Sequence, residues 1–194
     1  MSATINRDRL AALKEDEDEL FVRRHPRSRL LFQQAQAHML DGVPMNWMTR
    51  WPSPFPPYVE KAHGATVTCV DGHTYIDFCL GDTGAMAGHS PGTTVEAVRR
   101  QLEMGITTML PTEDCLWVAA ELSRRFGLQY WQVALTATDA NRFAVRLARH
   151  VTRRPKILAF NYCYHGSVDE TLITINDGVP GPKPGNVGPP VDPT

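Results

Sequence analysis

Residues 131–166, WQVALTATDANRFAVRLARHVTRRPKILAFNYCYHG, decide the fold class of this chain. An apolar run at 131–135 predicts a strand, and residues 139–150 predict a helix because their apolar side chains recur on one stripe at helical spacing. A second apolar run at 156–160 predicts another strand. A crossover of this length joins two parallel strands through a covering helix, so the stretch predicts an α/β fold.

The loop before the predicted helix carries residues suited to binding a phosphate. Thr136, Ala137 and Thr138 place two hydroxyls and several backbone N–H groups at a helix N-terminus. Such N–H groups lack partners inside the helix and attract anions. The alternative interpretation is that Thr138 merely caps the helix.

The segment after the second predicted strand carries an aromatic residue and a histidine. Tyr164 can lie flat against a planar ring, and His165 can donate a hydrogen bond or a proton; the alternative is that both only pack in the core. Ligands of open α/β sheets gather at the carboxyl ends of parallel strands. The two loops together therefore predict a small, flat, phosphorylated cofactor, either pyridoxal phosphate (PLP), flavin mononucleotide or another mononucleotide.

Further elements are predicted on both sides of this stretch. Asp71-Gly72 predicts the turn of a β-hairpin. The loop at 43–58, which contains Trp47 and Arg50, either lines a pocket or straps the surface. The tail at 177–194 is rich in proline and glycine, so no regular element is expected there. We expect helices at 5–20, at 28–39 with Ser28 as a possible N-cap, at 91–104 and at 112–126, and hairpin strands at 65–70 and 74–78.

Composition excludes several classes of function. The 20 Lys and Arg residues balance 21 Asp and Glu, and the formal net charge of −1 argues against nucleic acid or anionic membrane as a partner. No apolar stretch is long enough to span a bilayer, and the first twenty residues lack the apolar core of a signal peptide, so we expect a cytoplasmic protein. No zinc or other metal site is expected from the spacing of the cysteines, which are Cys69, Cys79, Cys115 and Cys163.

Four motifs resemble those of the class III aminotransferases. The turn Thr136–Asn141 is similar to the family's Ser-Gly-Thr-Glu-Ala-Asn turn, and Tyr164–Gly166 is similar to its aromatic-His-Gly triplet. Val70–Phe78 resembles its D-G-x-x-Y-I-D hairpin, and Gly88–Pro91 its G-H-x-x-P corner. Within the group, the resemblance is closest to glutamate-1-semialdehyde aminomutases and the related β-amino-acid aminotransferases.

The resemblance implies the α/β fold of PLP-dependent transferases of fold type I. The chain would supply the N-terminal segment and the first part of the large domain, with an incomplete sheet. Residues 1–80 would be the helices and hairpin of the small-domain portion, and residues 81–194 would begin the PLP-binding domain. Family members are usually homodimers with active sites at the subunit interface.

The resemblance also implies roles for individual residues. Ala137 and Thr138 would hold the PLP phosphate, with Thr136 beside it. Ala137 stands where the family has glycine, so its φ must be negative. Tyr164 would stack on the pyridine ring, while His165 and Gly166 would shape the turn beneath it.

Three residues outside these motifs are candidates to face an amino acid or keto acid substrate, namely Trp47, Arg50 and Asp82. PLP chemistry also needs a lysine that binds the cofactor covalently. None of the chain's lysines stands in the family's context, so we expect the catalytic lysine to lie outside this chain and the chain alone to be inactive. The alternatives are a PLP-dependent racemase or epimerase of the same fold, or a non-catalytic truncated paralogue.

Overall fold

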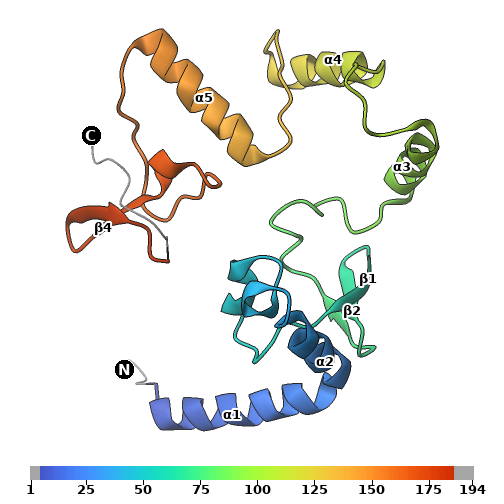
Figure 1. Ribbon diagram of the computed structural model, residues 1–194, viewed down its shortest axis with the longest axis vertical. Helices are drawn as coiled ribbons and strands as arrows, with labels where there is room; N and C mark the ends of the chain where they lie inside the picture. The colour runs from blue at the N-terminus through green and yellow to red at the C-terminus, as the bar shows by residue number, and fades with distance from the viewer. Residues whose placement is uncertain (1–4, 186–194) are drawn as a thin grey trace. The chain divides into compact units, whose positions relative to one another are not determined.

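The computed structural model describes residues 5–185 and forms two compact units, Met1–Thr108 and Met109–Thr194 (Figure 1). The first unit begins with two helices that meet at His25, continues through two short 3-10 turns and a small sheet, and ends with a third helix. Its elements are α1 (Arg7–Arg24), α2 (Pro26–Ala35), η1 (Leu40–Gly42), η2 (Asn46–Arg50), β1 (Val59–His63), β2 (Thr66–Cys69), β3 (Thr74–Ile76) and α3 (Gly92–Met104).

The sheet of the first unit confirms the predicted hairpin and adds a strand. β2 and β3 are antiparallel, with Val67 opposite Tyr75, and Gly72 in the turn has a φ of 84°. β1 pairs antiparallel with the other edge of β2, so the strand order is β1-β2-β3. β1 was not predicted, because its sequence VEKAH lacks the β-branched alternation that marked its neighbours.

The predicted N-cap at Ser28 is wrong, because Asp71 caps α2 from the hairpin turn. α2 begins at Pro26, and the side chain of the preceding His25 makes no capping hydrogen bond. The carboxylate of Asp71 instead accepts from the backbone N–H groups of Arg27 at 2.7 Å and Ser28 at 3.1 Å. The Ser28 hydroxyl also donates to Asp71, at 2.5 Å. The free N–H groups at the helix start are thus satisfied by a residue about forty positions away in the chain.

Aromatic rings around Phe55 form the core of the first unit. Phe55 is buried, and its ring centroid lies 5.1 Å from that of Phe21 and 6.2 Å from that of Phe32. His25 is also buried; its Nδ1 donates to the Phe21 carbonyl at 2.8 Å, and its Nε2 is hydrogen-bonded to the Tyr75 hydroxyl at 2.6 Å. The second half of the loop at 43–58 therefore packs against this core, whereas η2, with Trp47 and Arg50, is more exposed.

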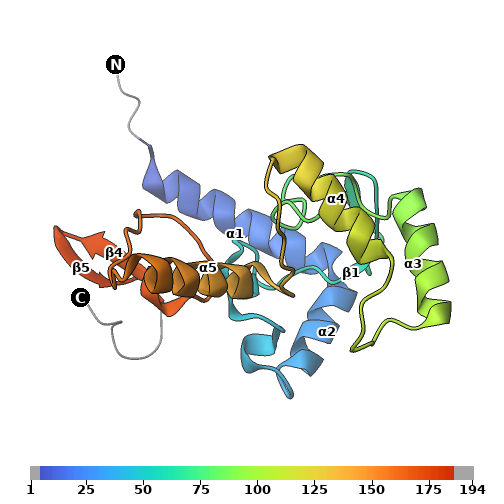
Figure 2. The ribbon, with the colours of Figure 1, turned by 90° about the horizontal axis from the view of Figure 1, so that it is seen from above.

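The second unit is built around one long helix and a C-terminal hairpin. Figure 2 shows the extended segment that leaves this helix and leads to the hairpin. None of the helices within residues 5–185 combines the length and apolar character that a membrane span needs. The unit's elements are α4 (Asp114–Phe126), α5 (Ala137–Thr152), η3 (Asp169–Thr171), β4 (Ile173–Asn176) and β5 (Val179–Pro182).

The predicted helices are present in the structure, although the one predicted at 28–39 runs from Pro26 to Ala35. The predicted strands on either side of α5 are wrong. Residues 131–135 and 156–160 lie outside any strand, so they do not form the expected parallel pair in the part of the chain that the structure describes. A strand needs a neighbouring strand to satisfy its backbone N–H and C=O groups. Within residues 5–185, neither segment has such a neighbour.

The expectation of no regular element in the tail is also wrong. β4 and β5 form an antiparallel hairpin, with Ile173 opposite Pro182 and Asn176 opposite Val179. Asp177-Gly178 makes its turn, and both residues have positive φ. The part of the tail at 186–194 lies outside the described residues.

A buried turn and an ion pair connect the hairpin region to α5. Val168 and Thr171 are buried at η3, and the Thr171 hydroxyl donates to the Val168 carbonyl at 2.8 Å. Arg149 of α5 contacts Glu170 at 2.6 Å and donates to the Pro155 carbonyl at 2.7 Å. The C-terminal half of the helix is therefore fixed to the segment that follows it.

We expect Asp71→Ala to destabilise the protein by about 1–3 kcal/mol, because the N–H groups of Arg27 and Ser28 lose their acceptor. Urea unfolding measures the change. The matched control is Asp16→Ala, which removes an exposed carboxylate from α1. Equal effects of the two substitutions would contradict the capping role of Asp71.

The same contact makes stability depend on pH. Burial acts to raise the pKa of Asp71, but the hydrogen bonds from Ser28 and from the Arg27 and Ser28 backbone outweigh it, so the pKa lies below its ordinary value. A carboxylate of this kind stabilises the fold above its unfolded pKa of about 3.9 and loses that contribution as the pH falls. The stability difference between wild type and Asp71→Ala should therefore be largest near neutral pH and shrink below about pH 4.

Candidate functional site

The N-terminus of α5 leaves two backbone N–H groups available to a ligand. The N-cap is Thr136, whose Oγ1 accepts from the Asp139 N–H at 3.1 Å and donates to the Asp139 carboxylate at 2.8 Å. The interpretation of Thr138 as a cap is therefore wrong, because Thr138 lies one position inside the helix. Within the described residues, the N–H groups of Ala137 and Thr138 have no acceptor, which is the arrangement that binds a phosphate.

Ala137 meets the conformational condition set by its methyl group. It is the first residue of α5, and its φ is not positive. Its Cβ therefore causes no backbone strain at the position where the family has glycine. The N–H group of Ala137 remains presented at the helix end.

Gly166 brings the second predicted loop against this helix end. Gly166 is buried with a φ of 76°, and a Cβ built on it would lie 2.0 Å from Thr138 Oγ1 and 2.9 Å from Thr138 Cα. The next residue, Ser167, donates its N–H to Thr138 Oγ1 at 3.2 Å. The two loops that were predicted to bind one cofactor are therefore in direct contact, and only glycine fits at their closest approach.

Asn141 makes a second connection between the helix and the loop. Its side-chain amide donates to the carbonyl of His165 at 3.0 Å. Asn141 lies three positions after Thr138, so both side chains are on the same face of α5. This role of Asn141 was not predicted, although its helical spacing from Thr138 is visible in the sequence.

The aromatic residue of this loop is open to a ligand. Tyr164 is 79% exposed and lies two residues before Gly166, while His165 is half-buried. The Thr138 hydroxyl accepts from Ser167, so its own proton is free to donate to an anion. Thr136, Ala137, Thr138, Tyr164, His165 and Gly166 thus gather in one region of the second unit.

The three predicted substrate residues all lie in the first unit. Trp47 and Arg50 are on η2, and Asp82 follows the sheet. Within residues 5–185, no hydrogen bond, ion pair or ring contact joins Asp82 to Trp47 or Arg50. Their substrate-binding roles stay predictions.

The loop that carries Asp82 has a bent backbone, and a contact between Asp77 and His89 joins the residues on either side of it. Asp77 contacts His89 Nε2 at 2.7 Å and accepts from the N–H groups of Cys79 and Leu80. The hydrogen bond from His89 is the main reason that the pKa of Asp77 lies below its ordinary value. Residues 80–83 all have positive φ, a conformation that costs non-glycine residues energy and is often found at functional sites.

We expect Gly166→Ala to be more destabilising than Gly178→Ala. Both glycines have positive φ, and so each substitution costs about 1–2 kcal/mol of backbone strain. Only at Gly166 does the new methyl group collide with Thr138, which adds about 1–3 kcal/mol. Urea unfolding of the two variants measures the difference, and equal midpoints would contradict the close approach.

Known proteins are similar to this chain over a region that contains both loops. The sequence profile described as aminotransferase class-III matches residues 47–179. A glutamate-1-semialdehyde 2,1-aminomutase of Methanocaldococcus jannaschii is 36% identical over 153 residues, covering 78% of this chain and 35% of that protein. The chain thus spans about a third of that relative's length.

Solved structures of the same group have a similar fold. A crystal structure of a glutamate-1-semialdehyde aminomutase from Pseudomonas aeruginosa matches with a TM-score of 0.90 and 47% identity, covering 94% of this chain and 41% of that one. A lysine-to-alanine variant of it, in complex with PMP, matches equally well. An omega-transaminase from Sphaerobacter thermophilus matches with a TM-score of 0.73 and 32% identity, covering 83% of this chain and 38% of that one.

These likenesses confirm the expected fold class, in which the described residues form part of a fold type I PLP-dependent transferase with an incomplete sheet. The profile match contains both loops that meet at Gly166, together with the hairpin and the corner at His89. The chain belongs to the class III aminotransferase family.

Proposed function

We propose that the protein of which this chain is part is a PLP-dependent aminotransferase or aminomutase, and that the N-terminus of α5 and the Tyr164–Gly166 loop hold the cofactor. The observation that carries the proposal is the contact between Thr138 and Gly166. That contact brings the loop that carries the exposed Tyr164 against a helix end whose first N–H groups are free within the described residues. A small, flat molecule with a phosphate fits both features.

The residues divide between the two ends of the cofactor. The N–H groups of Ala137 and Thr138 and the hydroxyl of Thr138 donate to the phosphate, and the positive end of the helix dipole favours its charge. Thr136 orients this end by capping the helix. The ring of Tyr164 covers one face of the pyridine, and the His165 carbonyl, held by Asn141, fixes the loop beneath it. When bound, PLP supplies an electron sink for negative charge that develops on the substrate carbon.

The proposed contacts with the phosphate and the ring do not include the lysine that the chemistry needs. None of the lysines in the chain stands in the family's context for that residue. The lysine-to-alanine variant of the Pseudomonas aeruginosa enzyme was crystallised with PMP. This supports a binding site that holds the cofactor through its phosphate and ring without the lysine.

Within the family, we favour an aminomutase acting on an amino-carbonyl compound, because the relatives of similar sequence carry that name. The comparisons do not favour a racemase or a non-catalytic paralogue. Trp47, Arg50 and Asp82 are the proposed substrate-facing residues, with the Arg50 guanidinium suited to a carboxylate. Product formation from glutamate-1-semialdehyde without a separate amino donor is the measurement that separates an aminomutase from an aminotransferase.

We also propose a cytoplasmic homodimer with active sites at the subunit interface. α3 and α4 expose many large apolar side chains, which favours burial against further protein. These side chains include Val95, Val98, Leu102, Leu116 and Trp117.

PLP binding by the purified protein tests the cofactor assignment. We expect a new visible absorption band or a saturable spectral change with wild type. Thr138→Val should weaken binding about 10- to 150-fold, because it removes a hydrogen bond to a charged group worth about 1.5–3 kcal/mol. Thr138→Ser keeps the hydroxyl and should bind as wild type does.

The matched control for this experiment lies at the other end of the same helix. Thr152 donates its hydroxyl to the Ala148 carbonyl at 2.7 Å, so Thr152→Val removes an equivalent group far from the proposed phosphate. Wild-type affinity in Thr138→Val, or equal losses in the two valine variants, would overturn the assignment. A protein whose spectrum does not change on adding PLP would overturn the proposed function.

A further inference from the structure

The β4–β5 hairpin makes two contacts with the segment that leads to Tyr164. The first is made by Asn161, whose side chain pairs with the backbone of Ile175 in β4. Ile175 donates its N–H to Asn161 Oδ1 at 3.0 Å, and Asn161 Nδ2 donates to the Ile175 carbonyl at 3.4 Å. The amide side chain thus takes the place of a neighbouring strand, and fixes the start of the loop to the hairpin.

The second contact is made by Lys183, directly after β5. Its backbone N–H donates to the Leu172 carbonyl at 3.0 Å, which anchors the residue at the base of the hairpin. Its half-buried side chain crosses to the loop, where the ammonium group donates to the Cys163 carbonyl. Cys163 is the residue before Tyr164, so this hydrogen bond holds the peptide from which the tyrosine projects.

The loop needs such support because its backbone is bent. Tyr162 has a φ of 65°, in the left-handed region that costs a non-glycine residue about 1–2 kcal/mol. A turn hydrogen bond from the Cys163 N–H to the Phe160 carbonyl, at 3.3 Å, is long. A hydrogen bond from a charged donor is stronger than a neutral one, and Lys183 supplies it to the next peptide group, at the carbonyl of the same residue.

We propose that Lys183 is a positioning residue for the proposed cofactor site. It acts through the Cys163 carbonyl to set the orientation of the Tyr164 ring, while Asn141 and Gly166 hold the other end of the loop against α5. The loop is thereby held from two sides, one of them the hairpin. Lys183 lies beyond the residues that the family profile matches, and its role rests on the proposed function for the part that concerns PLP.

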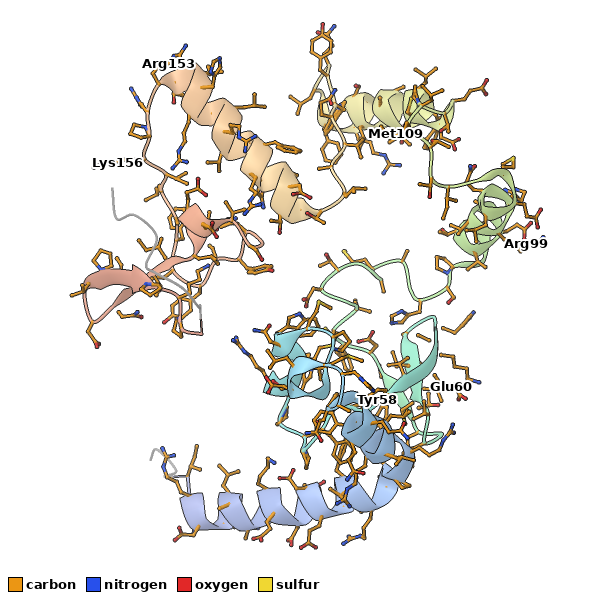
Figure 3. All side chains as sticks on the ribbon, viewed as in Figure 1. Tyr58, Glu60, Arg99, Met109, Arg153 and Lys156 are labelled. Atoms are coloured by element: carbon orange, nitrogen blue, oxygen red, sulfur yellow. The ribbon has the colours of Figure 1, made fainter. Side chains whose placement is uncertain are left out.

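Three variants of the whole protein test this role. Lys183→Met removes the donor and keeps most of the apolar stem, whereas Lys183→Arg restores a charged donor. Lys156→Met is the matched control, because Lys156 is an exposed lysine on the segment between α5 and the hairpin (Figure 3). No hydrogen bond or ion pair of Lys156 is found within residues 5–185.

Amide hydrogen exchange without PLP gives a readout that does not depend on the cofactor. We expect Lys183→Met to speed exchange in residues 161–167 about tenfold, as loss of one charge-assisted hydrogen bond predicts, with α4 unchanged. Lys183→Arg should restore wild-type exchange. The control variant should match wild type throughout.

The visible circular dichroism and affinity of bound PLP give the second readout. We expect Lys183→Met to weaken binding about tenfold and to change the dichroism of the ring, because Tyr164 no longer stacks in a fixed orientation. Lys183→Arg should restore both. Together with faster exchange in the methionine variant, this result supports the positioning role.

Each other outcome overturns the role. Unchanged exchange in Lys183→Met shows that the lysine does not hold the loop. Faster exchange with unchanged PLP affinity and dichroism shows that the loop does not position the cofactor, while the proposed function stands. A loss that arginine does not rescue assigns Lys183 a structural role only. If wild type itself binds no PLP, the proposed function fails and the positioning role fails with it.

Discussion

The candidate site depends on the absence of a side chain at Gly166. Any Cβ there would overlap Thr138, so the loop can approach the helix end only with glycine at this position. Two hydrogen bonds, from Ser167 to Thr138 and from Asn141 to His165, then keep the two segments together. Without this close approach, the aromatic ring and the free N–H groups would be two unrelated features of a loop and a helix.

Capping decides which backbone N–H groups remain available to a ligand at each helix start. At α2, Asp71 satisfies the free N–H groups, and the helix end becomes a structural joint with the hairpin turn. At α5, Thr136 satisfies only the Asp139 N–H, and the N–H groups of Ala137 and Thr138 stay free within the described residues. The same backbone chemistry therefore gives a structural contact in one unit and a candidate anion site in the other.

Local signals in the sequence predicted local structure well. The helices α3, α4 and α5 follow from apolar spacing, and the β2–β3 hairpin follows from Asp71-Gly72. The errors concern partners that are distant in the chain: Ser28 has the composition of an N-cap, but the sequence does not show that the Asp71 carboxylate lies beside α2. The segments at 131–135 and 156–160 have strand composition, but pairing depends on neighbours that composition does not show. The contact of Lys183 with Cys163 is not predictable for the same reason, because its proline- and glycine-rich surroundings do not indicate the hairpin that directs it there.

A crystal structure of the protein with PLP or PMP would show directly whether the N-terminus of α5 and Tyr164 hold the cofactor. We expect phosphate oxygens within hydrogen-bond distance, about 2.7–3.2 Å, of the backbone nitrogens of Ala137 and Thr138, with the Tyr164 ring parallel to the pyridine. A cofactor whose phosphate lies away from the N-terminus of α5, or whose ring is covered by another residue, would contradict it.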